Sequence, residues 1–95
     1  MAYKARLTVK SVAGHCSAGY KAGNQFATDG TTIAGEQGQG ICLYAVPSLA
    51  PYLTAFCRDT DPSDWINGLS ELQCPDSRNT VVFAVERTAG VKPPT

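Results

Sequence analysis

The sequence predicts an α+β domain, in which a small, mainly antiparallel sheet of three to four strands packs against one main, proline-interrupted helix. Two segments near the ends of the chain, 3–12 and 81–85, have the apolar patterns of strands. Between them, segment 41–57 repeats apolar residues at three- and four-residue steps, which is typical of a helix. The 95 residues suit one domain. We assign it to residues 1–90 and expect a flexible tail at 91–95.

The N-terminal half is predicted to contain two strands. Segment 3–12 alternates apolar residues with basic or hydroxyl residues, so one face of this strand is buried and the other is solvated. A short second strand is expected at 25–28, around Phe26, because an Asp-Gly turn signal follows it. Segment 31–40 contains three glycines and few apolar residues, and we predict a flexible loop there.

Segment 41–57 is predicted to be the main helix, with apolar residues from Leu43 to Phe56 on one side. Pro47 and Pro51 each remove a backbone donor and clash with the preceding turn, so the helix either begins near Pro47 or is kinked there. Residues 65–72 are expected to form a short helix or turn that caps the core.

The final strand is apolar on both faces, which is typical of a central position in a sheet. We therefore expect the first and last strands to pair at the centre of the sheet.

Composition excludes several classes of protein. Eight basic and eight acidic residues give a net charge of zero, which disfavours nucleic-acid binding. No apolar run reaches the length of a membrane span. The chain begins without the apolar core of a signal peptide, so we expect a cytoplasmic protein with reduced thiols. In an oxidising compartment the four cysteines could instead form two disulfides, in three possible connectivities.

Three of the four cysteines are predicted to share a site. Cys42 and Cys57 lie at opposite ends of the predicted helix, roughly 20 Å apart at 1.5 Å per residue. This leaves Cys16, Cys42 and Cys74, each at the end of an element, where ligand loops commonly lie. Such a set could bind zinc or iron. The chain has no C-x-x-C pair, however, and each cysteine could equally be a small buried hydrophobic residue.

Cys42, His15 and Asp76 are the candidate catalytic residues. A helix N-terminus stabilises a thiolate, so Cys42 is expected to be the most reactive thiol. His15 and Asp76 could serve as acid–base groups or as further metal ligands. Alternatively, His15 hydrogen-bonds a carbonyl in its loop and Asp76 caps a turn.

Three amphipathic aromatic residues on or near the helix are candidates for lining a ligand pocket. Their hydroxyl and indole groups could orient a small apolar metabolite, whereas in the alternative they pack on the core with their polar tips at the surface. These residues are Tyr44, Tyr52 and Trp65.

Taken in order, several short motifs resemble a family of short, uncharacterised bacterial proteins. The resemblance covers residues from about 5 to 87 and implies no established activity. It implies cysteines at positions 16, 42 and 74 but not regularly at 57, and this chain departs from the pattern at Asn24, where Asp is usual, and at Pro47. The motifs are Gly14-x-Cys16, Gly19-Tyr20-Lys21-x-Gly23-x-x-Phe26, Gly40-x-Cys42, Leu49-x-Pro51-Tyr52, Cys74-Pro75-Asp76 and Asn79-x-Val81-Val82-Phe83-x-x-x-Arg87.

The sequence is therefore consistent with three alternative functions, of which the first is the leading hypothesis. The first is a small cytoplasmic domain that binds a metal ion or carries reactive thiols at Cys16, Cys42 and Cys74. The second is a small enzyme of the isomerase, cyclase or lyase type that acts on an apolar metabolite. The third is an oligomerisation or interaction module, because a homo-oligomer would bury apolar surface that a thin core leaves exposed.

Overall fold

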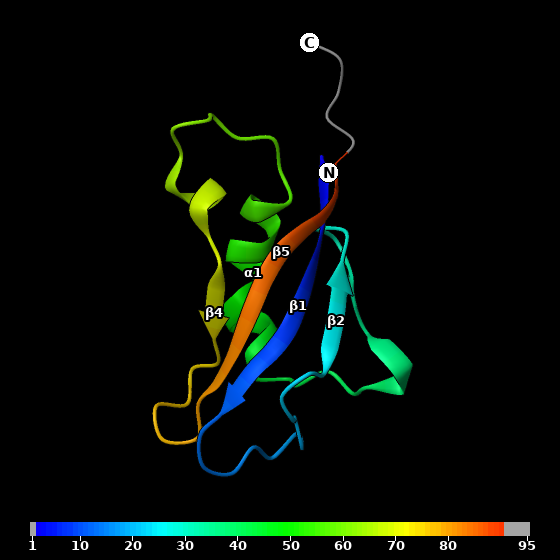
Figure 1. The fold of residues 1–95 in the computed structure, drawn as a ribbon, viewed down its shortest axis with the longest axis vertical. Coiled ribbons are helices and arrows are strands. Elements are labelled where there is room, and N and C mark those ends of the chain that lie inside the picture. Colours follow the sequence, from blue (N-terminus) through cyan, green and yellow to red (C-terminus); the bar gives the residue numbers. More distant parts are fainter. Residues whose placement is uncertain (1, 91–95) are drawn as a thin grey trace.

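The computed structural model describes residues 2–90, with the backbone alone at 89 and 90, so the predicted tail lies outside the described residues. Figure 1 shows a single sheet with one long helix against it, which confirms the α+β class. The elements in chain order are β1 (Tyr3–Val12), β2 (Gln25–Thr28), β3 (Ile33–Gly35), the 3-10 helix η1 (Glu36–Gly38), α1 (Ala45–Phe56), the 3-10 helix η2 (Trp65–Gly68), β4 (Glu71–Gln73) and β5 (Val81–Gly90).

The sheet has five strands rather than the predicted three to four. All neighbouring pairs are antiparallel, in the order β3-β2-β1-β5-β4. The strands missing from the prediction are β3 and β4, which have three residues each and lie at the two edges. Three residues are too few for alternation to be recognised in the sequence. The prediction of a flexible loop at 31–40 is therefore wrong, because this segment contains strand β3 and the 3-10 helix η1.

The first and last strands pair at the centre of the sheet, as predicted. In the β1–β5 ladder Leu7 lies opposite Val85 and Val9 lies opposite Phe83. Leu7 and Val9 are each 1% exposed and Phe83 is 2% exposed, so this pair supplies much of the core. Such close cross-strand apolar pairs are a main source of sheet stability.

Helix α1 covers one face of the sheet through Leu49, Leu53 and Phe56, which are all buried. It begins at Ala45, so Pro47 stands in the first turn, where a missing backbone N–H costs little. Leu43, predicted to lie on the buried side, precedes the helix and is 84% exposed. Within residues 2–90, no helix has the length and apolar character that crossing a membrane requires.

Arg87 joins the end of α1 to β5 and η2. Its Nε donates a hydrogen bond to the carbonyl of Phe56 (2.9 Å), and its Nη2 donates to Oδ1 of Asn67 (2.8 Å). The guanidinium carbon lies 4.1 Å from the ring centroid of Tyr3 and 4.6 Å from that of Phe56. Arg87 thus satisfies a carbonyl that the helix end would otherwise leave without a partner.

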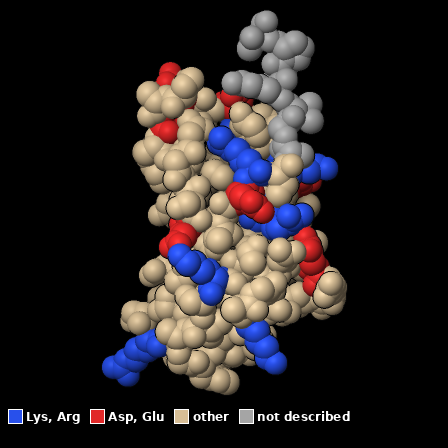
Figure 2. All heavy atoms as spheres, viewed as in Figure 1, with Lys and Arg blue, Asp and Glu red and all other residues tan. Residues whose placement is uncertain are grey.

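The other face of the sheet is solvated and carries ion pairs. Figure 2, drawn from the same side as Figure 1, shows acidic and basic side chains beside one another over this face. Arg6 lies 3.7 Å from both Glu36 and Glu86, and Lys10 pairs with Glu71. These pairs are exposed, so we assign them only a small contribution to stability.

Candidate functional site: a thiol-lined cavity

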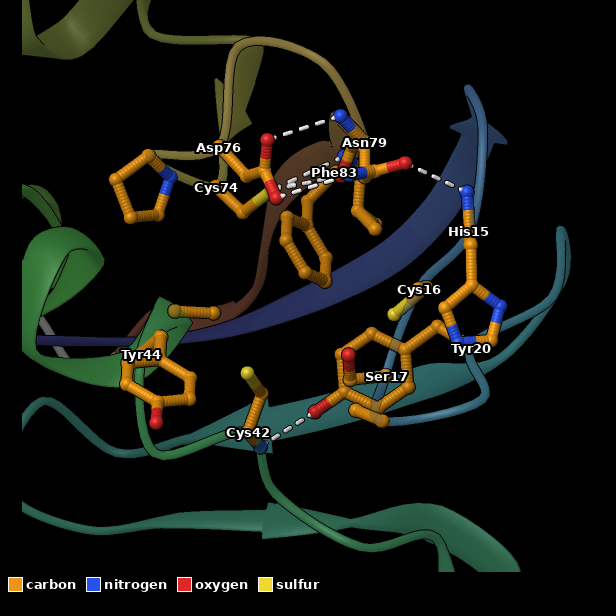
Figure 3. Close-up of a pocket in the computed structure, with 14 residues that line it drawn as sticks. His15, Cys16, Ser17, Tyr20, Cys42, Tyr44, Cys74, Asp76, Asn79 and Phe83 are labelled. Atoms are coloured by element: carbon orange, nitrogen blue, oxygen red, sulfur yellow. Dashed lines mark hydrogen bonds between the residues drawn. The ribbon is translucent and has the colours of Figure 1, made fainter.

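A cavity of about 380 Å³ opens where three loops meet at one end of the sheet. The loops connect β1 to β2, η1 to α1, and β4 to β5. Cys16, Cys42 and Cys74 come from these three loops and all line the cavity, whereas Cys57 does not (Figure 3). The four cysteines are free thiols.

An aromatic cluster holds the inner end of the cavity. The ring centroids of Tyr20 and Phe26 are 5.1 Å apart, and that of Phe83 lies 6.1 Å from each of them. All three rings are almost completely buried. Tilted and edge-to-face arrangements of this kind are the favoured geometries of aromatic pairs. The cluster therefore anchors the first loop, which carries Tyr20, on the core of the sheet.

The hydroxyl group of Tyr20 ties this first loop to the segment that carries Cys42. It accepts a hydrogen bond from the backbone N–H of Cys42 (2.7 Å) and donates one to the carbonyl of Gly40 (3.1 Å). Burial raises the pKa of Tyr20, and the hydrogen bond from Cys42 acts in the opposite direction. The phenol is consequently neutral at neutral pH, and both of its hydrogen bonds are used in holding the cavity wall.

Cys16 and Cys42 are the two partly buried thiols of the wall. Figure 3 shows both sulfur atoms pointing into the cavity, near the side chain of Tyr20. The carbonyl of Cys42 accepts a hydrogen bond from Val46 N–H (3.2 Å), which places Cys42 just ahead of α1, as predicted. Among the described residues neither sulfur makes a hydrogen bond, in contrast to that of Cys74.

Asn79 fixes the loop that carries Cys16. Its Oδ1 accepts a hydrogen bond from the backbone N–H of His15 (2.8 Å), and its Nδ2 donates to Asp76 (3.3 Å). Gly14 has a φ of +70°, and a Cβ atom at this position would lie 2.4 Å from Asn79 Oδ1. Only glycine suits both this backbone conformation and the close approach.

Cys74 has a structural position in the wall. It is 9% exposed, and its sulfur accepts a hydrogen bond from the backbone N–H of Val81 (3.1 Å). The thiol also donates to the carbonyl of Asn79 (3.6 Å). These two bonds hold the loop between β4 and β5 closed and occupy the sulfur atom.

The two predicted acid–base residues line the cavity but are not paired with a thiol. Within residues 2–90, no hydrogen bond joins the imidazole of His15 to a cysteine sulfur. Asp76 caps its turn, accepting hydrogen bonds from the N–H groups of Arg78 (2.9 Å) and Asn79 (3.0 Å). These hydrogen bonds, that of Asn79 first, lower the pKa of Asp76, so it is a carboxylate at neutral pH.

The structure separates the three aromatic residues that were predicted to line one pocket. Tyr44 lines the thiol cavity and is 78% exposed. Tyr52 of α1 and Trp65 of η2 instead pack edge to face, with ring centroids 6.3 Å apart, and line a different surface depression.

Cys57 is completely buried at the end of α1. Its carbonyl accepts a hydrogen bond from the backbone N–H of Tyr3 (2.8 Å). Burial raises the pKa of this thiol, which makes it a poor nucleophile.

Within residues 2–90 there is no group of three or more His, Cys, Asp or Glu side chains with the spacing of a metal site. Binding of zinc or iron therefore stays a prediction from the sequence.

Tyr20 and Asn79 are site residues that the sequence did not identify as candidates. Neither is a typical nucleophile or metal ligand, and their roles depend on contacts 22 and 64 residues away along the chain. Both residues belong to the motifs on which the family resemblance rests, and these motifs are the feature of the sequence that could have identified them.

Asn24, where the family pattern has Asp, accepts a hydrogen bond from the backbone N–H of Lys21 (2.8 Å). An amide oxygen thus provides the turn contact at this position.

No family model, curated protein or solved structure matches the chain. The resemblance to the short bacterial proteins accordingly stays a prediction.

Proposed function

We propose that this protein is a small thiol domain in which Cys16 and Cys42 react with a small molecule held in the cavity. The observation that carries the proposal is the convergence of three thiols from three separate loops on one cavity, where two of the sulfur atoms make no hydrogen bond to the part of the chain that the structure describes. A volume of about 380 Å³ lies within the range of small-molecule sites. Cys74 stabilises the loop that forms part of the cavity wall, and Cys57 does not line the cavity.

Two features support this reaction over acid–base catalysis. Asp76 is engaged by its turn, the phenol of Tyr20 is engaged between two loops, and within residues 2–90 the imidazole of His15 makes no hydrogen bond to a thiol. A general acid or base needs a free proton position that faces the substrate. The isomerase, cyclase or lyase hypothesis therefore stays a prediction, as does oligomerisation.

Alkylation of the folded protein by iodoacetamide, followed site by site with peptide mass spectrometry, tests the proposal. We expect Cys16 and Cys42 to be modified at least about tenfold faster than Cys57 and Cys74, because reaction requires an accessible thiolate. In denaturant all four thiols should react at similar rates.

A matched pair of variants separates the cavity from general exposure. Ala18 is exposed and lines the cavity, whereas Ala27 is exposed on β2 and does not. Ala18→Trp should slow alkylation of Cys16 and Cys42, and Ala27→Trp should leave both rates unchanged. If Ala18→Trp has no effect on either thiol, the cavity is not where they react, and the proposal fails.

A further inference from the structure

The cavity wall is largely apolar, and so is part of its rim. Tyr44 stands at the opening, and its neighbour Leu43 is also strongly exposed. Exposed apolar groups beside a cavity favour a ligand that is itself apolar. The apolar residues that line the cavity are Ala18, Ala45, Pro75, Val81, Phe83 and the ring of Tyr20.

The charge of the wall points to an uncharged ligand. Asp76 is the acidic side chain of the wall, and its hydrogen bonds keep it ionised. Among the described residues the wall contains no lysine or arginine. Lys21 and Arg78 neighbour wall residues in the sequence, but their side chains are not part of the wall. A phosphate or carboxylate would therefore meet the negative charge of Asp76, and the wall as described offers no permanent positive charge to offset it.

The nucleophiles of the wall limit the chemistry further. The hydroxyl of Tyr20 and the sulfur of Cys74 are occupied by hydrogen bonds. The hydroxyl of Ser17 is a much weaker nucleophile than a thiol unless a base activates it. Cys16 and Cys42 are thus the strongest unoccupied nucleophiles of the wall, and sulfur reacts readily with polarisable electrophilic carbon.

Resting on the proposed function, we infer that the substrates of this site are uncharged, apolar molecules with an electron-poor alkene, to which Cys16 or Cys42 adds. The sulfur atom bonds to one alkene carbon while the π bond breaks. The thiol proton passes through solvent to the neighbouring carbon. All atoms of both reactants are retained, and no oxidant or reductant is consumed.

Two maleimides that share one electrophile test this assignment. N-cyclohexylmaleimide is neutral and apolar, whereas 3-maleimidopropionate carries a carboxylate. Rates of adduct formation at each cysteine are measured by peptide mass spectrometry and divided by the rates with N-acetylcysteine. We expect the folded protein to favour the cyclohexyl reagent at Cys16 or Cys42 by at least about tenfold, because apolar contact and charge act in the same direction.

Two variants identify the source of the preference. Asp76→Asn keeps the Oδ1 acceptor of the turn and removes the charge, so it should raise the rate of the anionic reagent several-fold relative to that of the neutral one. Ala18→Trp should slow the neutral reagent most, with Ala27→Trp as the control outside the cavity.

The outcomes separate the two claims. If both reagents react in the ratio seen with N-acetylcysteine while Ala18→Trp still blocks them, the thiol cavity stands and the substrate class is wrong. A preference for the anionic reagent would overturn the substrate class in the same way. Loss of the Ala18→Trp effect with both reagents would overturn the proposed function itself.

Discussion

Tyr20 and Asn79 each connect two loops that lie far apart in the sequence. The phenol of Tyr20 holds the Cys42 segment, and the amide of Asn79 holds the backbone of His15, next to Cys16. The two loops that carry Cys16 and Cys42 are therefore held by side chains from other parts of the cavity wall. Loops held in this way lose less conformational entropy when a ligand binds.

Arg87 provides a sharp test of the packing at the other end of the molecule. We expect Arg87→Lys to lower the free energy of unfolding by about 1–3 kcal/mol, since an ammonium group cannot make both hydrogen bonds while stacking on two rings. Urea denaturation measures the loss. Arg78→Lys is the control, because the Arg78 side chain is exposed; it should change stability by less than about 0.5 kcal/mol. Equal effects would contradict the role assigned to Arg87.

At the scale of elements, the short edge strands and the prolines of α1 account for most differences between expectation and structure. Strands β3 and β4 exist because their neighbours offer unpaired backbone groups, and their own three-residue sequences contribute little. The helix begins just before Pro47 and continues through Pro51 because its buried face packs on the sheet. Tertiary packing therefore overrides a poor local propensity.

Replacing the two prolines of α1 separates these effects. Pro51 is exposed inside the helix, so we expect Pro51→Ala to raise the free energy of unfolding by about 1–2 kcal/mol. Pro47 stands in the first turn, and Pro47→Ala should change stability by less than about 1 kcal/mol, towards destabilisation. Urea denaturation of both variants provides the comparison. Stabilisation by Pro47→Ala alone would show that the helix end is assigned wrongly.

At the scale of the whole molecule, stability depends on one thin core between α1 and a single face of the sheet. The opposite face carries exposed ion pairs, and the segment before α1 exposes its apolar side chains. A chain of this size buries a limited share of its surface, so each core residue contributes a large part of the total.

Two leucines test this distribution. Leu7 is 1% exposed on the central strand, and Leu7→Ala should cost about 2–5 kcal/mol. Leu43 is 84% exposed, and Leu43→Ala should change the free energy of unfolding by less than about 0.5 kcal/mol. Thermal and urea unfolding measure both. A large loss for Leu43→Ala, increasing with protein concentration, would instead reveal an interface between copies of the chain.

The sequence by itself predicted the α+β class, the central pairing of the first and last strands, and the helix over most of its length. These features follow from apolar periodicity, which a strand or helix displays within its own residues. The candidate residues of the three cavity loops were also recognisable, because thiol, imidazole and carboxylate groups are identified by type. The structure brings Cys16, Cys42 and Cys74 to one cavity and leaves Cys57 in the core.

Only the tertiary structure decided which of these groups are free. Cys74 and Asp76 are occupied by backbone N–H groups of their own loop, whereas the sulfur atoms of Cys16 and Cys42 face the cavity. It also revealed Tyr20 as the link between two loops. Hydrogen bonds and packing between distant segments depend on how the loops are arranged in space. Local residue patterns do not specify that arrangement.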